Sequence, residues 1–421
     1  MRFKKLLLAS VLGLAIATPA AADTVCEWMD FARKALPQGS GGSPLVTAVR
    51  TGEGDHLMTK AALAMFEAVN AIDHRYRSYV DMPMKSASAD QQVAGITAVY
   101  TVLSAQPGVN KTDLDGNYAL AMAGVPEGAA KSDAIAIGKA AAEAVLKIGD
   151  LAPARTLPAY RPVTTPGQWV PTALPFGMNQ MPAYRPWLLK SAQEVRPGPP
   201  PALTSERYAR DFNEVKKMGA RDSKDRSQVE TLMARYRITP EDLPALRNVT
   251  DRDGRSMVDN ARLFALYGMM QDDLGIAYMD SKLHYSFWRP ITAIRNADKD
   301  GNPATEMDPN WLPLMNTPNH GEYPCGHCMN AGAVAELMTR LGGAKPAWGV
   351  RIGSSSIPSS AVQVLPDWNE WARQVSYSRT LGGVHYRFSN EAGEQIGRNL
   401  ARLTLERVLQ PLAPAEVRPA S

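Results

Sequence analysis

Three short segments in the C-terminal half of this 421-residue chain concentrate histidines and cations at spacings that could hold an anion. They are KLHYSFWRP at 282–290, HGEYPCGHC at 320–328 and SRTLGGVHYRF at 378–388. Three cations, a nest of amides and two histidines suit one phosphate-like oxyanion, without any carboxylate as a metal ligand. The prediction depends on the combination and order of the segments, because each alone has a simpler explanation.

The first segment places two cations seven positions apart. At helical spacing Lys282 and Arg289 would point to one side, where like charges repel unless something negative lies between them. We expect the helix over 257–288 to stop at Arg289, because a residue before a proline is biased away from the α region. Taken alone, such a pair is typical of a solvated helix face.

The second segment combines a helix start with two cysteines. Pro324 suits the start of a helix, whose unpaired amides at Cys325, Gly326 and His327 would attract an anion. The Cys325/Cys328 spacing also fits a periplasmic thiol oxidoreductase. No strand precedes the pair, however, and no βαβ pattern surrounds it. A local disulfide or two buried thiols are further possibilities.

The third segment can bring an arginine and a histidine to one point. Arg379 lies six residues before His385, and Gly382 and Gly383 between them let the chain bend back. With the first two segments this completes the series Lys-x6-Arg-Pro, Pro-x-Gly-His and Ser-Arg-x5-His.

This ordered series resembles the type 2 phosphatidic acid phosphatase and vanadium-dependent haloperoxidase superfamily. LAMFEAVNAID (63–73), TTPGQWVPT (164–172) and PPPALTSERYARDFNEVKKMG (199–219) are similar to its exported bacterial haloperoxidase-like branch. The resemblance therefore covers most of the chain. It implies an all-α helical bundle of the chloroperoxidase and acid phosphatase type.

The resemblance also implies roles for individual residues. Lys282, Arg289, Arg379 and the amide of Gly326 would bind the equatorial oxygens of vanadate or phosphate. Cys325 belongs to the same oxyanion-binding set and stands where the family usually has a serine.

Two histidines would carry the chemistry that the resemblance implies. His385 would be the axial group, which coordinates vanadium in the peroxidases and is the phosphorylated nucleophile in the phosphatases. His327 would be the acid/base partner opposite it.

Four positions bear on the choice of substrate. His320 falls where bromide-oxidising members often carry a histidine, and Met279 stands where a chloride-oxidising relative has an aromatic residue. Cys325 replaces a hydroxyl with a weaker donor that peroxide can oxidise, and Ser389 replaces the usual Asp. These departures favour bromide or iodide over chloride.

The sequence therefore predicts an exported, vanadate-dependent haloperoxidase-like enzyme that oxidises halide with hydrogen peroxide. The main alternative is an acid phosphatase that acts on phosphomonoesters through a phosphohistidine and needs no cofactor. A non-catalytic anion-binding relative is also possible. A calcium loop at 296–308 is disfavoured, because Met307 occupies the twelfth position, where such loops have Glu.

The N-terminus predicts export to the periplasm or beyond. Residues 1–22 combine Arg2, Lys4 and Lys5 with an apolar run and small residues, as in a signal peptide cleaved after Ala22. No later apolar run is long enough for a membrane span. Without the three N-terminal cations, 43 Lys and Arg face 42 Asp and Glu, so net charge gives no reason to expect nucleic-acid binding.

Helical periodicity dominates the remaining chain and predicts a single all-α domain over 23–421, with the active-site half at 205–410. A proline-rich segment at 157–202 should cover the helical core, since it contains Trp169, Phe176, Trp187 and Leu188. Ser132 or Asp133 is expected to cap one helix. The other expected helices lie at 56–73, 91–105, 131–148, 326–341, 368–380 and 390–409.

Overall fold

The computed structural model describes residues 21–36, 53–82, 86–148, 163–172, 185–238, 240–252, 254–346, 349–354, 356 and 362–413. It is predominantly helical, with 59% helix and 4% strand, which confirms the all-α prediction. In chain order the helices are α1 (Ala21–Ala35), α3 (Glu53–Asn70), α4 (Gln91–Ser104), α5 (Lys111–Ala123), α6 (Ala129–Leu146), η1 (Ala192–Val195), α7 (Glu206–Met218), α8 (Gln228–Tyr236), α9 (Asp242–Thr250), α10 (Met257–Tyr285), α11 (Pro290–Arg295), η2 (Ala297–Lys299), α12 (Gly326–Gly342), α13 (Trp368–Leu381) and α14 (Arg387–Arg407).

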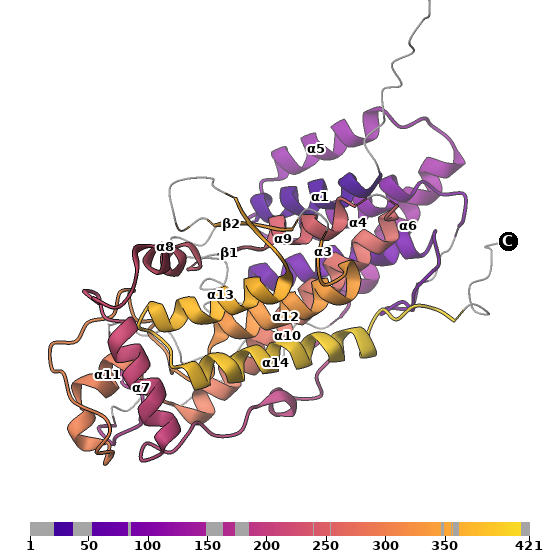
Figure 1. The fold of residues 1–421 in the computed structure, drawn as a ribbon. Coiled ribbons are helices and arrows are strands. Elements are labelled where there is room, and N and C mark those ends of the chain that lie inside the picture. Colours follow the sequence, from indigo (N-terminus) through magenta and orange to yellow (C-terminus); the bar gives the residue numbers. More distant parts are fainter. Residues whose placement is uncertain are drawn as a thin grey trace, which may run out of the picture.

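The long helices α10, α12, α13 and α14 lie along the middle of the molecule (Figure 1). Helices α1, α3, α4, α5 and α6 gather toward one end, and α7 and α11 lie at the other. Among the described residues, no helix is long and apolar enough to cross a membrane. The predicted signal peptide falls outside the described residues except for Ala21 and Ala22, where α1 begins.

Side-chain caps begin most of the predicted helices. Asp90, Ser205 and Ser256 each accept a hydrogen bond from an amide in the first turn of the helix that follows. Helix α6 is different, because it begins after Gly128 without any side-chain cap. The expectation that Ser132 or Asp133 caps it is therefore wrong, and α5 was not predicted at all.

Helix α10 ends earlier than its sequence suggests. It stops at Tyr285, and Ser286 follows in the left-handed region with φ 43°. Arg289 is the N-cap of α11, and Pro290 is the first residue of that helix. Proline suits this position because its missing N–H would have no helical partner there. The prediction that one helix carries both Lys282 and Arg289 is wrong, since a turn separates them.

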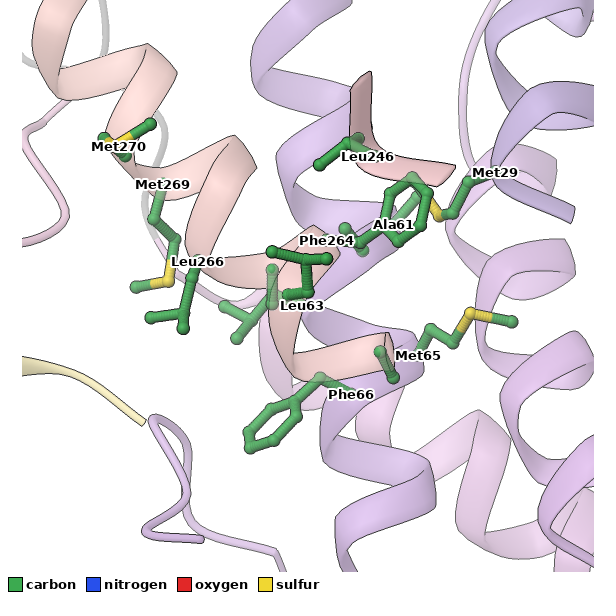
Figure 2. Packing of buried hydrophobic residues seen from close by; sticks show 14 of the residues in the cluster. Met29, Ala61, Leu63, Met65, Phe66, Leu246, Phe264, Leu266, Met269 and Met270 are labelled. Atoms are coloured by element: carbon green, nitrogen blue, oxygen red, sulfur yellow. The ribbon is translucent and has the colours of Figure 1, made fainter. Parts of the chain in front are cut away.

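The main core lies between the helices of the N-terminal half and α10. Leu63 and Phe66 of α3 and Phe264 and Leu266 of α10 belong to one buried cluster, which Met29 joins from α1 (Figure 2). All five side chains are buried. The same core continues along α10 as far as Met279, three residues before Lys282.

The proline-rich segment lies against α10, as predicted, in its described part. Asp273 accepts hydrogen bonds from the amides of Trp187, Leu188 and Leu189 at 2.7, 3.0 and 2.9 Å. The Trp187 indole N–H donates to Asp272 at 2.7 Å. Two adjacent acids of α10 thus anchor the covering segment, while Phe176 lies outside the described residues.

A small antiparallel sheet, which the sequence did not predict, lies beside α9. Its strands are β1 (Pro240–Glu241), β2 (Val350–Ser354) and β3 (Gln363–Leu365), in the order β1-β2-β3.

The polar loop at 296–308 is a turn held by its own hydrogen bonds. Asp300 accepts from the Asn302 amide at 2.8 Å and from the Thr305 hydroxyl at 2.7 Å. No group of three or more His, Cys, Asp or Glu side chains that could hold a metal ion occurs among the described residues.

Helices α12 and α14 approach closely through glycines. A Cβ at Gly397 would collide with the Met329 carbonyl oxygen and lie 2.7 Å from the Ala333 amide nitrogen. Both obstacles are backbone atoms of α12, which cannot rotate away. The N-terminus of α12 and the loop before α14 both belong to the candidate site, so this contact fixes their relative position.

Gly397→Ala should lower the free energy of unfolding by about 2–4 kcal/mol, because α14 must move away from α12. Gly116→Ala is the matched control, since a Cβ on this α5 glycine meets nothing within 4 Å. There we expect stabilisation by about 0.5–1 kcal/mol from the reduced freedom of the unfolded chain. Chemical denaturation of both variants checks this, and equal effects would contradict the close-packing argument.

Candidate active site

The fold brings the three cation-bearing segments together in the interior. Lys282 near the end of α10, Arg289 before α11, and Arg379 in α13 are 1%, 0% and 3% exposed. His385, in the loop between α13 and α14, is 2% exposed. Each of these cations lowers the pKa of the His385 imidazole, after burial, which is the larger cause. The sequence predicted these four residues as one cluster, and they form one.

The hydrogen bonds of His385 define its tautomer. Its Nδ1 lies 2.7 Å from Glu322 Oε1, and its Nε2 lies 3.1 Å from Arg289 Nη1. A guanidinium can only donate, so Nε2 is the acceptor and the proton resides on Nδ1, donated to Glu322. His385 is therefore a neutral imidazole whose Nε2 lone pair faces a cation, as a nucleophile or an anion ligand requires.

Glu322 is the functional candidate that sequence reasoning missed. It is fully buried, and its Oε1 also accepts from the Tyr386 amide at 3.1 Å. Burial raises the pKa of this carboxyl to about 7, while Arg289 and Lys282 oppose the rise. Glu322 supplies the negative charge that the like-charged pair Lys282 and Arg289 needs. In the sequence, the hint to look for such an acid was Ser389, which stands where the family usually has Asp and lies beside Glu322.

Lys282 braces the segment that carries Glu322. Its Nζ donates to the carbonyls of Gly321, Glu322 and Pro324 at 2.9, 2.8 and 2.6 Å. These three bonds use all the donors of an ammonium group. Burial and then Arg289 lower its pKa well below the usual value. Lys282 therefore acts through its charge and by holding the 321–324 segment in place. To donate to an anion directly, its Nζ would have to give up one of the three carbonyl hydrogen bonds.

Arg379 is the cation with uncommitted donors. Its Nη1 has a thioether as partner, Met315 Sδ at 3.8 Å, and its buried Nε has no hydrogen-bond partner. Burial and Arg289 lower the pKa of Arg379 to about 9, so it stays charged at neutral pH. An unpaired buried N–H is costly, and a bound anion would satisfy it.

His327 is neutral and held in one tautomer. Its Nε2 donates to the Ile238 carbonyl at 3.0 Å, which leaves Nδ1 free to accept a proton. Burial and then the charge of Arg379 lower the pKa of His327 to about 3. A bound anion would offset the charge of Arg379 and raise this pKa again.

His320 contacts the same arginine as His385. Its Nδ1 accepts from Arg289 Nη2 at 2.9 Å, and its carbonyl accepts from Arg289 Nε at 2.9 Å. Tyr278 faces the His320 ring at 6.5 Å and would be 3.6 Å from a Cβ at Gly326. Met279 packs within the main core. The aromatic residue beside His320 and Gly326 is therefore Tyr278, which the sequence did not single out.

The two cysteines of the second segment form a disulfide at the start of α12, with a Cα–Cα distance of 5.3 Å between Cys325 and Cys328. Cys325 is the N-cap, and its Sγ accepts from the Cys328 amide at 3.2 Å. Both sulfurs belong to fully buried residues, beneath Gly393 of α14. Thiol exchange with a protein substrate needs an accessible sulfur, so the geometry favours a structural disulfide over an oxidoreductase.

Comparisons with known proteins match the part of the chain that carries this cluster. The model of the VCPO second helical-bundle domain matches residues 262–414, a range that contains every residue of the cluster. A vanadium chloroperoxidase from Curvularia inaequalis is 38% identical over 92 residues, which is 20% of this chain and 14% of that protein. These two matches support the resemblance to the vanadium haloperoxidase superfamily over residues 262–414.

Solved structures of the superfamily share the fold over nearly the whole chain. A bacterial vanadium-dependent iodoperoxidase matches with a TM-score of 0.67 and 20% identity, covering 94% of this chain and 97% of its own. A bacterial vanadium-dependent chloroperoxidase in its apo form matches with a TM-score of 0.66 and 16% identity, covering 89% and 96%. The likeness of fold thus covers far more of the chain than the local sequence match does.

The residues present fit the oxyanion that this superfamily is named for. The unpaired Arg379 Nε is a buried donor that awaits an acceptor, and His385 Nε2 carries a lone pair that accepts from Arg289 Nη1 and would turn to a bound anion. The surrounding charges are cationic, with Glu322 turned toward the far nitrogen of His385. Vanadate and phosphate are anions that need such donors and one imidazole, and neither needs a carboxylate ligand.

Proposed function

We propose that the chain is an exported vanadate-dependent peroxidase that oxidises halide with hydrogen peroxide, bromide or iodide in preference to chloride. The observation that carries this proposal is the neutral His385, whose Nδ1–H is held by Glu322 while Nε2 faces Arg289. Bound vanadate would supply a Lewis acid that activates peroxide toward halide. The resemblance to vanadium haloperoxidases over residues 262–414 and the donor chemistry support vanadate as the cofactor.

Each residue of the site has a task in this proposal. His385 Nε2 would hold the anion together with Arg379, while Glu322 keeps the imidazole oriented. Arg289 and Lys282 balance the added negative charge. His327 would take a proton at Nδ1 and return it, because its Nε2–H is occupied by the Ile238 carbonyl.

The same geometry supports an acid phosphatase as the second candidate. The Glu322 carboxylate increases the basicity of His385 Nε2, which would attack phosphorus and form an N–P bond while the ester P–O bond breaks. The bound phosphate ester would first raise the pKa of His327, so that Nδ1 takes up a proton and then gives it to the leaving oxygen. Water would then attack phosphorus, break the N–P bond and release phosphate. No cofactor takes part in this reaction, so vanadate would act as an inhibitor.

One paired assay separates the two functions. The mature protein is given vanadate, peroxide and bromide or iodide, and in parallel a phosphomonoester without vanadate. We expect halide oxidation that His385→Ala abolishes and that His284→Ala, an exposed histidine at the end of α10, leaves unchanged. Phosphate release that vanadate inhibits would instead establish the phosphatase. Anion binding without either activity would leave a non-catalytic relative.

Export is proposed on the sequence pattern of residues 1–22. The protein recovered from a periplasmic or culture fraction is expected to begin at Asp23, directly after Ala22, when its N-terminus is sequenced. A start one residue later, at Thr24, would keep the export proposal and move only the cleavage site. An intact Met1 would refute the proposal.

A further inference from the structure

A methionine lies against the cation that has the most free donors. Met315 Sδ is 3.8 Å from Arg379 Nη1, and the Met315 side chain is 8% exposed. Its backbone N–H donates to the Gly382 carbonyl at 3.0 Å, which ties it to the turn before His385. The thioether therefore belongs to the wall of the site.

Gly382 makes the space that the thioether fills. A Cβ at Gly382 would lie 2.6 Å from Met315 Sδ and 2.8 Å from its Cε. Any larger residue at 382 would push the sulfur away from Arg379. The contact between Met315 and Arg379 thus depends on the glycine-rich turn, which the sequence singled out only for its flexibility.

A thioether is a weak acceptor for a guanidinium, but its sulfoxide is a strong one. We propose that Met315 is an oxidation site: hydrogen peroxide converts it to a sulfoxide whose oxygen binds Arg379 and competes there with the oxyanion. This inference rests on the proposed function for two points, the presence of peroxide in the site and the use of Arg379 by the anion.

The reaction balances with peroxide as the oxidant. A sulfur lone pair attacks one peroxide oxygen, an S–O bond forms, and the O–O bond breaks. The second oxygen leaves as hydroxide and gains the proton from the first, which yields water. Sulfur loses two electrons, peroxide accepts them, and methionine sulfoxide reductases could reverse the modification.

The new oxygen would meet one donor of Arg379 directly. Arg379 Nη1 already points at the sulfur, and the buried Arg379 Nε has no partner. A charge-assisted N–H···O bond would replace the weak N–H···S contact. Oxidation should therefore hold Arg379 Nη1 on the sulfoxide and weaken its interaction with the anion, so that the enzyme loses affinity as its oxidant accumulates.

The test uses the full mature protein treated with hydrogen peroxide alone. Peptide mass spectrometry follows Met315 against Met307, which is 43% exposed, and the fully buried Met329. Titration calorimetry with inorganic phosphate and with orthovanadate follows the anion site. We expect Met315 to oxidise more slowly than Met307 and faster than Met329, and the dissociation constants to rise about tenfold.

Two variants keep the result interpretable. Met315→Leu should retain anion affinity after peroxide, whereas the matched Met218→Leu, in the same small hydrophobic cluster, should lose it like the wild type. Met315→Gln places a permanent amide oxygen near Arg379 and should weaken binding without peroxide. A Met315 that stays unmodified while Met307 is fully oxidised overturns the inference, as does unchanged affinity after its oxidation. Untreated protein that binds neither anion refutes the proposed function instead.

Discussion

Glu322→Gln is expected to lower kcat for halide oxidation by about 100-fold while leaving the protein folded. The amide keeps the size of the carboxyl and can still accept from the Nδ1–H of His385, which lies 2.7 Å away in the native protein. It removes the negative charge that increases the basicity of Nε2. Steady-state kinetics and a thermal unfolding curve measure both effects.

Glu336→Gln is the matched control for this substitution. Glu336 is another carboxylate of low exposure, but it pairs with Arg340 and Arg402 on α12 and α14, away from the site. It should leave kcat unchanged. A Glu322→Gln variant with wild-type kcat would mean that this acid only fills space behind the histidine.

The raised pKa of Glu322 gives the same substitution a second, pH-dependent signature. The value rises from 4.5 to about 7 on folding, because burial disfavours the charged form. Between these pH values the folded protein binds more protons than the unfolded chain, so this group's contribution to stability falls as pH rises. The loss amounts to about 3 kcal/mol by pH 8, and Glu322→Gln should remove it.

Activity should change in the opposite direction. The ionised carboxylate is the form that accepts the Nδ1–H of His385, so kcat should increase as pH rises through about 7. Denaturation at pH 5 and pH 8 together with a pH–rate profile tests both signs. The assignment would be contradicted if the free energy of unfolding of the wild type rose from pH 5 to pH 8 while that of Glu322→Gln stayed constant.

Lys282→Met is expected to lower the free energy of unfolding by about 3–6 kcal/mol even without any anion. The substitution leaves the carbonyls of Gly321, Glu322 and Pro324 without their shared donor, and hydrogen bonds to charged groups contribute about 1.5–3 kcal/mol each. The substitution also removes the repulsion between Lys282 and Arg289, which offsets part of the loss. The expected change in the free energy of unfolding is therefore smaller than the sum of the three hydrogen bonds.

Lys216→Met provides the comparison for Lys282. Lys216 also donates to a carbonyl and a carboxylate, both of Glu306, but at the surface, where water can replace it. It should change stability by less than about 1 kcal/mol. If Lys282→Met unfolds like the wild type in the absence of anion and loses only anion affinity, the lysine binds the anion directly and does not brace the segment.

Short-range patterns in the sequence were enough to locate the positions that matter and much of the helical framework. Helical periodicity and local caps involve neighbouring residues only, so α4, α12 and α13 begin and end within a few residues of prediction. The ordered motifs likewise pointed to Lys282, Arg289, Arg379 and His385, because residue type and spacing along one chain suffice to recognise them.

What these residues do to one another depends on contacts between distant segments, which the folded structure alone reveals. Glu322 and His385 are 63 positions apart, and Met315 and Arg379 are 64 apart, so no local pattern announces either contact. Burial then sets their protonation, since desolvation depends on every element packed around them. The same packing turns Lys282 from an expected anion ligand into a brace, and the cysteine pair into a buried disulfide.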